Sequence, residues 1–189
     1  LRSANKPMLV ACWFAVMKAG GIAVATMPML RAKELTQIIE KGEVTHALCD
    51  HALRAELEAA QLQTPRLAQA VYFGDTSAAG LEALMADQPT GFDNVATAAA
   101  DTCLLAFTSG TTGQPKATMH FHRDVMASCA CFPPHVLRAT ADDVFIGSPP
   151  LAFTFGLGGL LLFPMAVGAS TVLLEKAGPP QLLDGIKEF

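Results

Sequence analysis

A nine-residue run rich in hydroxyl side chains and glycine is the part of the sequence best suited to chemistry. It reads Thr108-Ser109-Gly110-Thr111-Thr112-Gly113-Gln114-Pro115-Lys116. Glycine lets the backbone turn tightly and approach a ligand closely, the hydroxyl groups can donate hydrogen bonds, and Lys116 adds a positive charge. Successive backbone N–H groups in such a turn favour an anion. The pattern therefore predicts a loop that binds a polyphosphate.

Two other interpretations of this run fit the sequence less well. The P-loop of nucleotide triphosphatases requires Gly-Lys followed by a Ser or Thr that binds magnesium. Here Pro115 precedes the lysine and Ala117 follows it, so a backbone donor and the metal ligand are both missing. A solvated linker could have a similar composition. However, the apolar run Cys103–Phe107 comes directly before the loop and predicts a buried strand that leads into it.

Residues 108–116 resemble the phosphate-loop signature of the adenylate-forming, or AMP-binding, superfamily. That signature reads Thr-Ser-Gly-Ser/Thr-Thr-Gly-x-Pro-Lys and is usually followed by glycine, where this sequence has Ala117. Residues 17–28 are similar to a second motif of the superfamily, with Ala25 in place of its usual proline. The order and the spacing of these motifs also match, so the resemblance covers nearly the whole chain.

A third motif of the superfamily, Pro-Leu-x-aromatic/His-x-x-Gly, is similar to residues 150–156. The resemblance places Phe153 beside the carboxylate substrate, with Phe155 and Gly156 in the same substrate motif. Many acyl-CoA ligases have histidine at this position. Phenylalanine followed by Gly-Leu-Gly looks like the benzoate and aminobenzoate ligases, although a lone Phe in an apolar run is usually a core residue.

The resemblance implies an ATP-dependent carboxylate–CoA ligase. In the superfamily, a carboxylate and ATP form an acyl-adenylate and pyrophosphate, and CoA then displaces AMP to give a thioester. An aromatic, benzoate-like acid is the expected substrate, and a fatty acid is the alternative. The residues implied to bind the ATP phosphates are Thr108, Ser109, Gly110, Thr111, Thr112, Gly113 and Lys116, of which Lys116 is also the implied catalytic residue.

Several family segments are missing from the 189 residues, so we expect a fragment of the large N-terminal domain that is inactive alone. Residues 1–92 would be its first α/β part and residues 93–189 its phosphate-loop and substrate-motif part, with the C-terminal domain absent. The Tyr-Gly-x-Thr-Glu segment, whose glutamate binds Mg²⁺, is not present, so that ligand is expected outside this chain. A noncatalytic nucleotide-binding module remains a rival, whereas a phosphotransferase lacks its catalytic aspartate motif.

Composition limits the other functions. Hydrophobic residues make up 51% and charged residues 16%, which favours a folded core over disorder. A net charge of −4 gives no general attraction for nucleic acid or anionic membranes. The five cysteines lie mostly among apolar residues, which fits the reducing cytoplasm. The uncharged run Val144–Leu174 could span a bilayer, but its prolines and glycines favour a buried core instead.

No metal site is expected within the sequence. The pair Cys129 and Cys131 lacks a second pair of ligands at a suitable spacing. His120 and His122 are two residues apart, whereas a helical metal pair prefers a spacing of four, so capping or packing beside the loop is the favoured role.

Alternating strand and helix patterns predict a layered α/β fold with mainly parallel sheets flanked by helices. Asp75 and Ser77 suit the N-terminal cap of one helix. Pro133 and Pro134 are expected to end the helix that follows the loop. The expected helices are 7–18, 31–41, 52–60, 78–85, one ending near 130, 160–167 and 180–189. The expected strands are 22–25, 44–49, 69–73, 103–107, 144–148 and 169–174, with a surface connection at 89–101.

Overall fold

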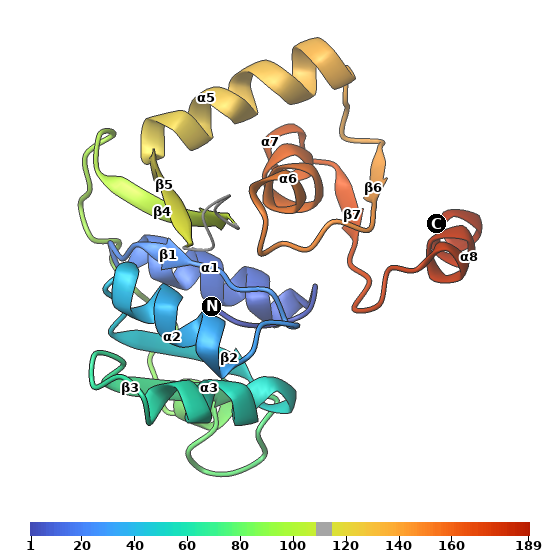
Figure 1. The fold of residues 1–189 in the computed structure, drawn as a ribbon. Helices are drawn as coiled ribbons and strands as arrows, with labels where there is room; N and C mark the ends of the chain where they lie inside the picture. Colours follow the sequence, from blue (N-terminus) through green and yellow to red (C-terminus); the bar gives the residue numbers. More distant parts are fainter. Residues whose placement is uncertain (109–114) are drawn as a thin grey trace.

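The structure is a computed structural model that describes residues 1–108 and 115–189. Within these residues the strands form three small sheets (Figure 1). The strands are β1 (Ala23–Val24), β2 (His46–Asp50), β3 (Gln69–Phe73), β4 (Thr102–Thr108), β5 (Lys116–Phe121), β6 (Val144–Ile146) and β7 (Ser170–Val172). The α-helices are α1 (Pro7–Lys18), α2 (Ala32–Lys41), α3 (Arg54–Gln61), α4 (Leu81–Ala86), α5 (His122–Phe132), α6 (Thr154–Leu157), α7 (Phe163–Val167) and α8 (Pro179–Glu188). Shorter helical turns are η1 (His51–Leu53), η2 (Pro133–Leu137) and η3 (Gly158–Leu162).

Strand β4 is the central strand of the sheet that carries the hydroxyl-rich run. It pairs in parallel with β1, where Ala23 is opposite Leu104, and antiparallel with β5, where Thr108 is opposite Lys116. The pairs β2–β3 and β6–β7 are also parallel. The prediction of a layered α/β fold with mainly parallel sheets is therefore confirmed.

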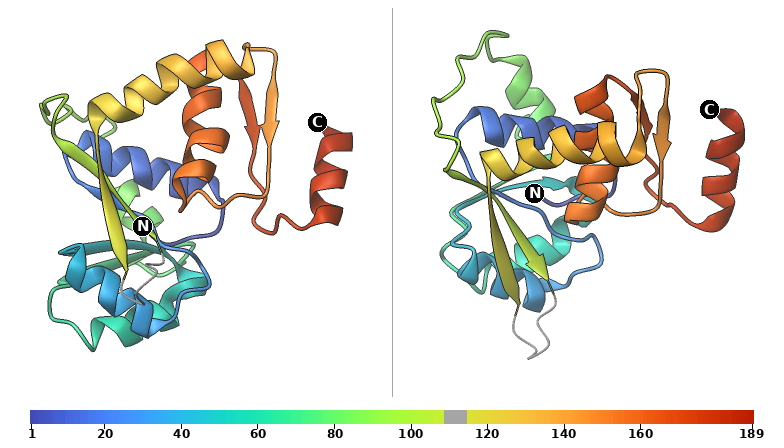
Figure 2. Two further views of the ribbon diagram at one scale, coloured as in Figure 1. Left: turned by 45° about the horizontal axis from the view of Figure 1, so that its top comes forward. Right: turned by 90° about the horizontal axis from the view of Figure 1, so that it is seen from above.

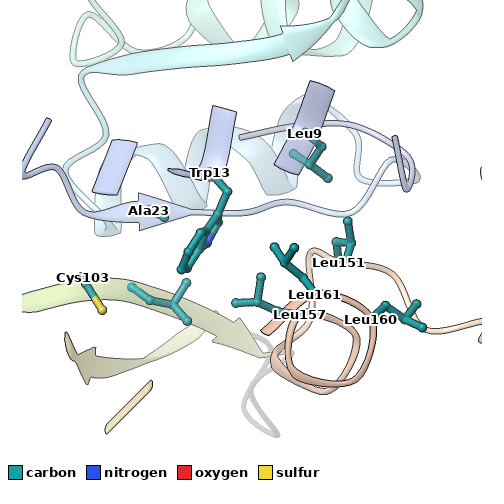
Figure 3. Packing of buried hydrophobic residues seen from close by; sticks show 9 residues of the cluster. Leu9, Trp13, Ala23, Cys103, Leu151, Leu157, Leu160 and Leu161 are labelled. Carbon is teal, nitrogen blue, oxygen red and sulfur yellow. The ribbon is translucent and has the colours of Figure 1, made fainter. Parts of the chain in front are cut away.

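Helix α1 joins the central sheet to the C-terminal helices through one apolar core. Pro7 occupies the first turn of the helix, where its missing N–H costs nothing, as the sequence predicts. Leu9 and Trp13 of α1 are buried against β1, β4 and the leucines around α6 and η3. Figure 3 shows the Trp13 ring extending from α1 toward β4, with Cys103 on one side and Leu157 and Leu161 on the other. Because the core draws on segments far apart in the sequence, it fixes α6 relative to the central sheet.

A second core lies between α2, α3 and the β2–β3 sheet. Leu35 and Ile39 of α2 are buried there together with Cys49 of β2 and Leu57 of α3. The predicted apolar face of α2 is confirmed, and Gly42 ends the helix as its C-cap residue. One apolar core between the two helices and the sheet therefore stabilises this part of the chain.

The segment before α1 connects these two cores, and Arg2 is its main anchor. Its backbone accepts a hydrogen bond from Asp50 N at 2.9 Å and donates one to Leu48 O at 3.0 Å, as a neighbouring strand would beside β2. Arg2 as a whole is only 3% exposed, and its guanidinium group donates to three backbone carbonyls. The acceptors are Met27 O at 2.7 Å, Pro28 O at 2.9 Å and Leu30 O at 2.9 Å. Arg2 therefore fixes the loop between β1 and α2.

The uncharged stretch 144–174 folds into β6, α6, η3, α7 and β7. Figure 2 shows these elements beside α5, with α8 at the edge of the molecule. Helix α8 lies close to β6, as shown by Gly185, where an added Cβ atom would lie 2.5 Å from Ile146 Cδ1. In the described parts of the chain, no helix combines the length and apolar character needed to cross a bilayer.

The structure differs from the sequence predictions at three places. Strand β5 was not predicted, because its exposed and half-buried residues lack a clear apolar face and the strand depends on pairing with β4. The α-helix α5 ends at Phe132 with Pro133 as its C-cap residue, as predicted, but the wider π-helical turn η2 continues the helical path to Leu137. Asp75 does not cap α4. It accepts instead from Ser77 N at 3.0 Å, and Gly80 is the N-cap residue.

The helix expected at 160–167 begins earlier, at Thr154. Glycines disfavour a helix on propensity alone, but here they permit close packing. A Cβ atom on Gly156 would lie 2.1 Å from Pro150 O, and one on Gly158 would lie 3.1 Å from the Phe163 ring. The other boundaries differ by a few residues, which is usual for element ends.

Replacing Arg2 tests its anchoring role. Arg2→Met keeps the side-chain length but leaves three carbonyls without donors, so the free energy of unfolding should fall by about 2–3 kcal/mol. Urea unfolding of the full chain measures this. Arg54→Met, at an exposed position on α3, is the matched control and should change the unfolding free energy by less than about 0.5 kcal/mol. Equal losses for the two variants would contradict the anchoring role.

The cysteines should differ in reactivity. Burial raises the pKa of the Cys12 thiol to about 11 and that of Cys49 to about 12, whereas Cys131 is exposed. Because the thiolate is the nucleophile, iodoacetamide at pH 8 should alkylate Cys131 in the native chain and leave Cys12 and Cys49 unmodified until urea is added. Peptide mass spectrometry reads out each site. Rapid alkylation of Cys49 in the native chain would show that the core between α2, α3 and the β2–β3 sheet is accessible to the reagent.

Candidate functional site

The hydroxyl-rich run occupies the connection between β4 and β5. Thr108 is the last residue of β4, Lys116 is the first residue of β5, and the two are paired across the ladder. Both are exposed. The structure therefore places a residue with a hydroxyl group and a residue with an ammonium group opposite each other at the end of the hairpin. Other predicted phosphate-binding residues lie outside the described residues, namely Ser109, Gly110, Thr111, Thr112 and Gly113.

The surroundings of Lys116 leave its charge available to a ligand. No carboxylate pairs with its ammonium group in the described part of the chain. An exposed lysine gains little from a surface partner in any case. Lys116 can therefore turn toward an anion at the end of the hairpin without breaking an existing ion pair.

A cavity of about 570 Å³ adjoins this end of the hairpin. This volume falls in the range of sites for small organic ligands. Phe107, Thr108 and Pro115 come from the hairpin, and Phe153 comes from the turn before α6. The other described residues that line it are Ala25, Thr26, Met27, Met29, Leu30, Glu34, Gln37, Ile38 and Ala152. This described lining is mostly apolar, with hydroxyl, amide and carboxylate groups at a few points.

The predicted substrate residues do not all reach this cavity. Phe153 lines it and is 44% exposed, so its ring is available to a ligand. Phe155 is 78% exposed and is not among the described residues that line the cavity. Gly156 is buried behind the turn, where its missing side chain allows α6 to approach Pro150 O. The structure therefore brings Phe153 and Thr108 to one cavity and gives Gly156 a packing role.

The sequence analysis missed one side of the cavity. Thr26, Met27 and Met29 lie in the loop after β1, and Glu34 and Gln37 lie on α2. No ligand-binding residue was predicted within the 17–28 motif or on α2. In the structure Met29 is 73% exposed next to the cavity, but its exposure depends on the fold and is not marked in the sequence.

The two histidines after the loop have separate environments. His120 Nε2 lies 3.1 Å from Thr118 Oγ1 on the exposed face of β5. His122 is the first residue of α5 and lines a different cavity, together with Cys129 and Trp13. Across residues 1–108 and 115–189, no three His, Cys, Asp or Glu side chains gather as a metal site would require.

Known proteins with sequences similar to this chain include several CoA ligases. The benzoate–CoA ligase of Thauera aromatica is 29% identical over 77% of this chain and 29% of its own length. The 4-hydroxybenzoate–CoA/benzoate–CoA ligase of Rhodopseudomonas palustris is 31% identical over 85% of this chain and 30% of its own length. The medium-chain fatty-acid–CoA ligase of Escherichia coli is 27% identical over 90% of this chain and 32% of its own length. This chain therefore spans less than a third of the length of these curated relatives.

A solved structure agrees with these relatives. The anthranilate CoA ligase AuaEII, in complex with anthranoyl-AMP, superposes with a TM-score of 0.87 at 28% identity, over 97% of this chain and 36% of that one. The family described as AMP-binding enzyme matches residues 1–189. Because this match covers the whole sequence, the chain belongs to the AMP-binding enzyme family.

Proposed function

We propose that this chain is the phosphate-binding part of an ATP-dependent carboxylate–CoA ligase. The observation that carries the proposal is the β4–β5 hairpin, which pairs Thr108 with Lys116 beside a ligand-sized cavity lined by Phe153. Membership of the AMP-binding enzyme family and the ligase relatives support it. In this proposal residues 1–92 and 93–189 are two parts of one large domain, and the remaining segments of the ligase are supplied outside this chain.

The chemistry requires an anion site next to a carboxylate site. A carboxylate oxygen attacks the α-phosphorus of ATP, the bond from that phosphorus to pyrophosphate breaks, and the acyl-adenylate forms. The CoA thiol then loses its proton, its sulfur attacks the acyl carbon, and AMP leaves with the electron pair of the bond between that carbon and the phosphate oxygen. Each step is aided where fixed donors stabilise the charge that develops on the leaving group.

The described residues fit the phosphate end of ATP. The Lys116 ammonium group would stabilise charge on the departing pyrophosphate, and the Thr108 hydroxyl group would donate to a phosphate oxygen. Both side chains are exposed at the same end of the hairpin, so neither has to leave a buried position first. We propose that Ser109, Gly110, Thr111, Thr112 and Gly113 complete this site. Mg²⁺, whose ligand we expect outside this chain, would offset phosphate charge.

The proposed carboxylate is aromatic. Phe153 offers a half-exposed ring at the cavity, and aromatic rings pair favourably with one another in offset or edge-to-face arrangements. Two relatives are named as benzoate–CoA ligases, which supports the same substrate class. A fatty acid is the second candidate, because a medium-chain fatty-acid–CoA ligase is also among the relatives and the cavity is mostly apolar.

Removing the Lys116 charge tests the phosphate site. In the full-length protein that carries this chain, Lys116→Ala should lower kcat/KM for pyrophosphate release by about two to three orders of magnitude, because charge on the leaving group loses its cation. Lys33→Ala removes the same charge from an exposed position on α2 and should leave kcat/KM within twofold. Equal rates for both variants, or no carboxylate-dependent pyrophosphate release by the unaltered protein, would favour a noncatalytic nucleotide-binding module instead.

Changing the aromatic ring tests the substrate class. Phe153→His should lower the ratio of kcat/KM for benzoate over hexanoate by about tenfold, because the smaller, polar ring pairs less well with the benzoate ring, a contact that hexanoate cannot make. Phe155→His makes the same change two residues along, on a side chain that is 78% exposed, and should leave the ratio unchanged. A ratio that favours hexanoate in the unaltered protein would support the fatty-acid alternative.

A further inference from the structure

The side chain of Asn5 makes two hydrogen bonds to a segment far away in the sequence. Its Nδ2 group donates to Pro149 O at 3.1 Å, and its Oδ1 atom accepts from Leu151 N at 2.8 Å. Asn5 is only 5% exposed. An amide carries a donor and an acceptor side by side, so Asn5 pairs with the backbone on both sides of Pro150 as a neighbouring strand would. The turn that leads to the substrate motif is thereby attached to the segment before α1.

The backbone from this turn to Phe153 has little freedom. Phe153 N donates to Pro150 O at 3.0 Å, and Phe153 O accepts from Leu157 N at 2.8 Å. Gly156 packs so closely that a Cβ atom on it would lie 2.1 Å from Pro150 O. A shift of Pro149 or Leu151 would therefore move Phe153 as well.

We propose that Asn5 is a positioning residue for the carboxylate pocket. It fixes the turn before α6 so that the Phe153 ring lies at the wall of the 570 Å³ cavity. Asn5 is not among the described residues that line this cavity, so it acts through the main chain and does not touch the substrate. This inference rests on the proposed function, because it assigns Phe153 to a carboxylate site.

The neighbours of Asn5 allow its role to be separated from general stability. Ser3 Oγ donates to Asp50 Oδ2 at 3.4 Å, and Lys6 Nζ lies 2.7 Å from the same oxygen. These contacts anchor the segment to β2 whether or not Asn5 is present. Ser3, which is 2% exposed, is therefore a matched control: it is buried, lies in the same segment and bonds to β2 instead of the turn.

The experiment uses the full-length protein that carries this chain, with Asn5→Leu, Asn5→Asp and Ser3→Ala. Asn5→Leu removes both hydrogen bonds and keeps the number and branching of the side-chain heavy atoms. Asn5→Asp keeps the acceptor for Leu151 N but places an oxygen against Pro149 O. Each variant is assayed for KM with benzoate and with ATP, by pyrophosphate release. Hydrogen exchange of the 150–157 backbone is measured by mass spectrometry.

We expect both Asn5 variants to raise the KM for benzoate about tenfold, with the KM for ATP within twofold. Asn5→Leu loses both hydrogen bonds, whereas Asn5→Asp loses the bond to Pro149 O and sets a carboxylate oxygen against that carbonyl. Exchange at Phe153 should become faster in both variants and exchange at Leu151 in Asn5→Leu, and Ser3→Ala should change neither property. Equal KM changes for Asn5→Leu and Ser3→Ala, parallel changes in both KM values, or unaltered exchange would each overturn the proposal. Should Asn5→Leu fail to fold, Asn5→Asp carries the same comparison.

If the proposed function is wrong, the pyrophosphate assay gives a different result. The unaltered protein would then release no pyrophosphate with benzoate or hexanoate. In that case exchange at residues 150–157 alone decides whether Asn5 fixes the turn.

Discussion

The double pairing of β4 is the constraint on which the rest of the structure depends. Its backbone bonds to β1 on one side and to β5 on the other, while Cys103 and Leu104 are buried against Trp13 of α1. Parallel pairing with β1 brings the loop that begins at Thr26 to the same end as Thr108. Antiparallel pairing with β5 returns the chain so that Lys116 lies opposite Thr108. One strand therefore gathers the hydroxyl group, the cation and the cavity.

Local patterns predicted the elements whose stability is mainly local. The face of α2 with Leu35, Ile38 and Ile39 follows from helical spacing alone, and all three residues are buried. Strand β5 could not be found this way, because its more buried and more exposed residues do not alternate clearly. Its backbone hydrogen bonds depend on pairing with β4. Helix α6 was missed for a similar reason, since buried glycines disfavour a helix on propensity but permit its close packing.

The candidate site likewise contains residues that sequence motifs mark and residues that only tertiary packing brings together. Thr108, Lys116 and Phe153 could be predicted because a sequence motif marks each of them. The far wall of the cavity could not, since Glu34 and Gln37 reach it only through the packing of α2 beside the central sheet. Arg2 and Asn5 carry no motif that we recognised, and their importance comes entirely from partners at least 25 positions away. Motifs thus marked the residues that we propose to bind phosphate and substrate, and tertiary contacts marked the residues that support them.

The long reach of Asn5 has a consequence for biosynthesis. Its partners Pro149 and Leu151 are 144 and 146 positions later in the chain. At translation rates of about 5–20 residues per second, a nascent polypeptide waits roughly 7–30 s before those partners exist. During that time the buried amide of Asn5 has no native acceptor or donor, and the core around Trp13 lacks the leucines of α6 and η3. The emerging chain therefore exposes apolar surface to the ribosome exit region and to chaperones until Leu161 has been synthesised.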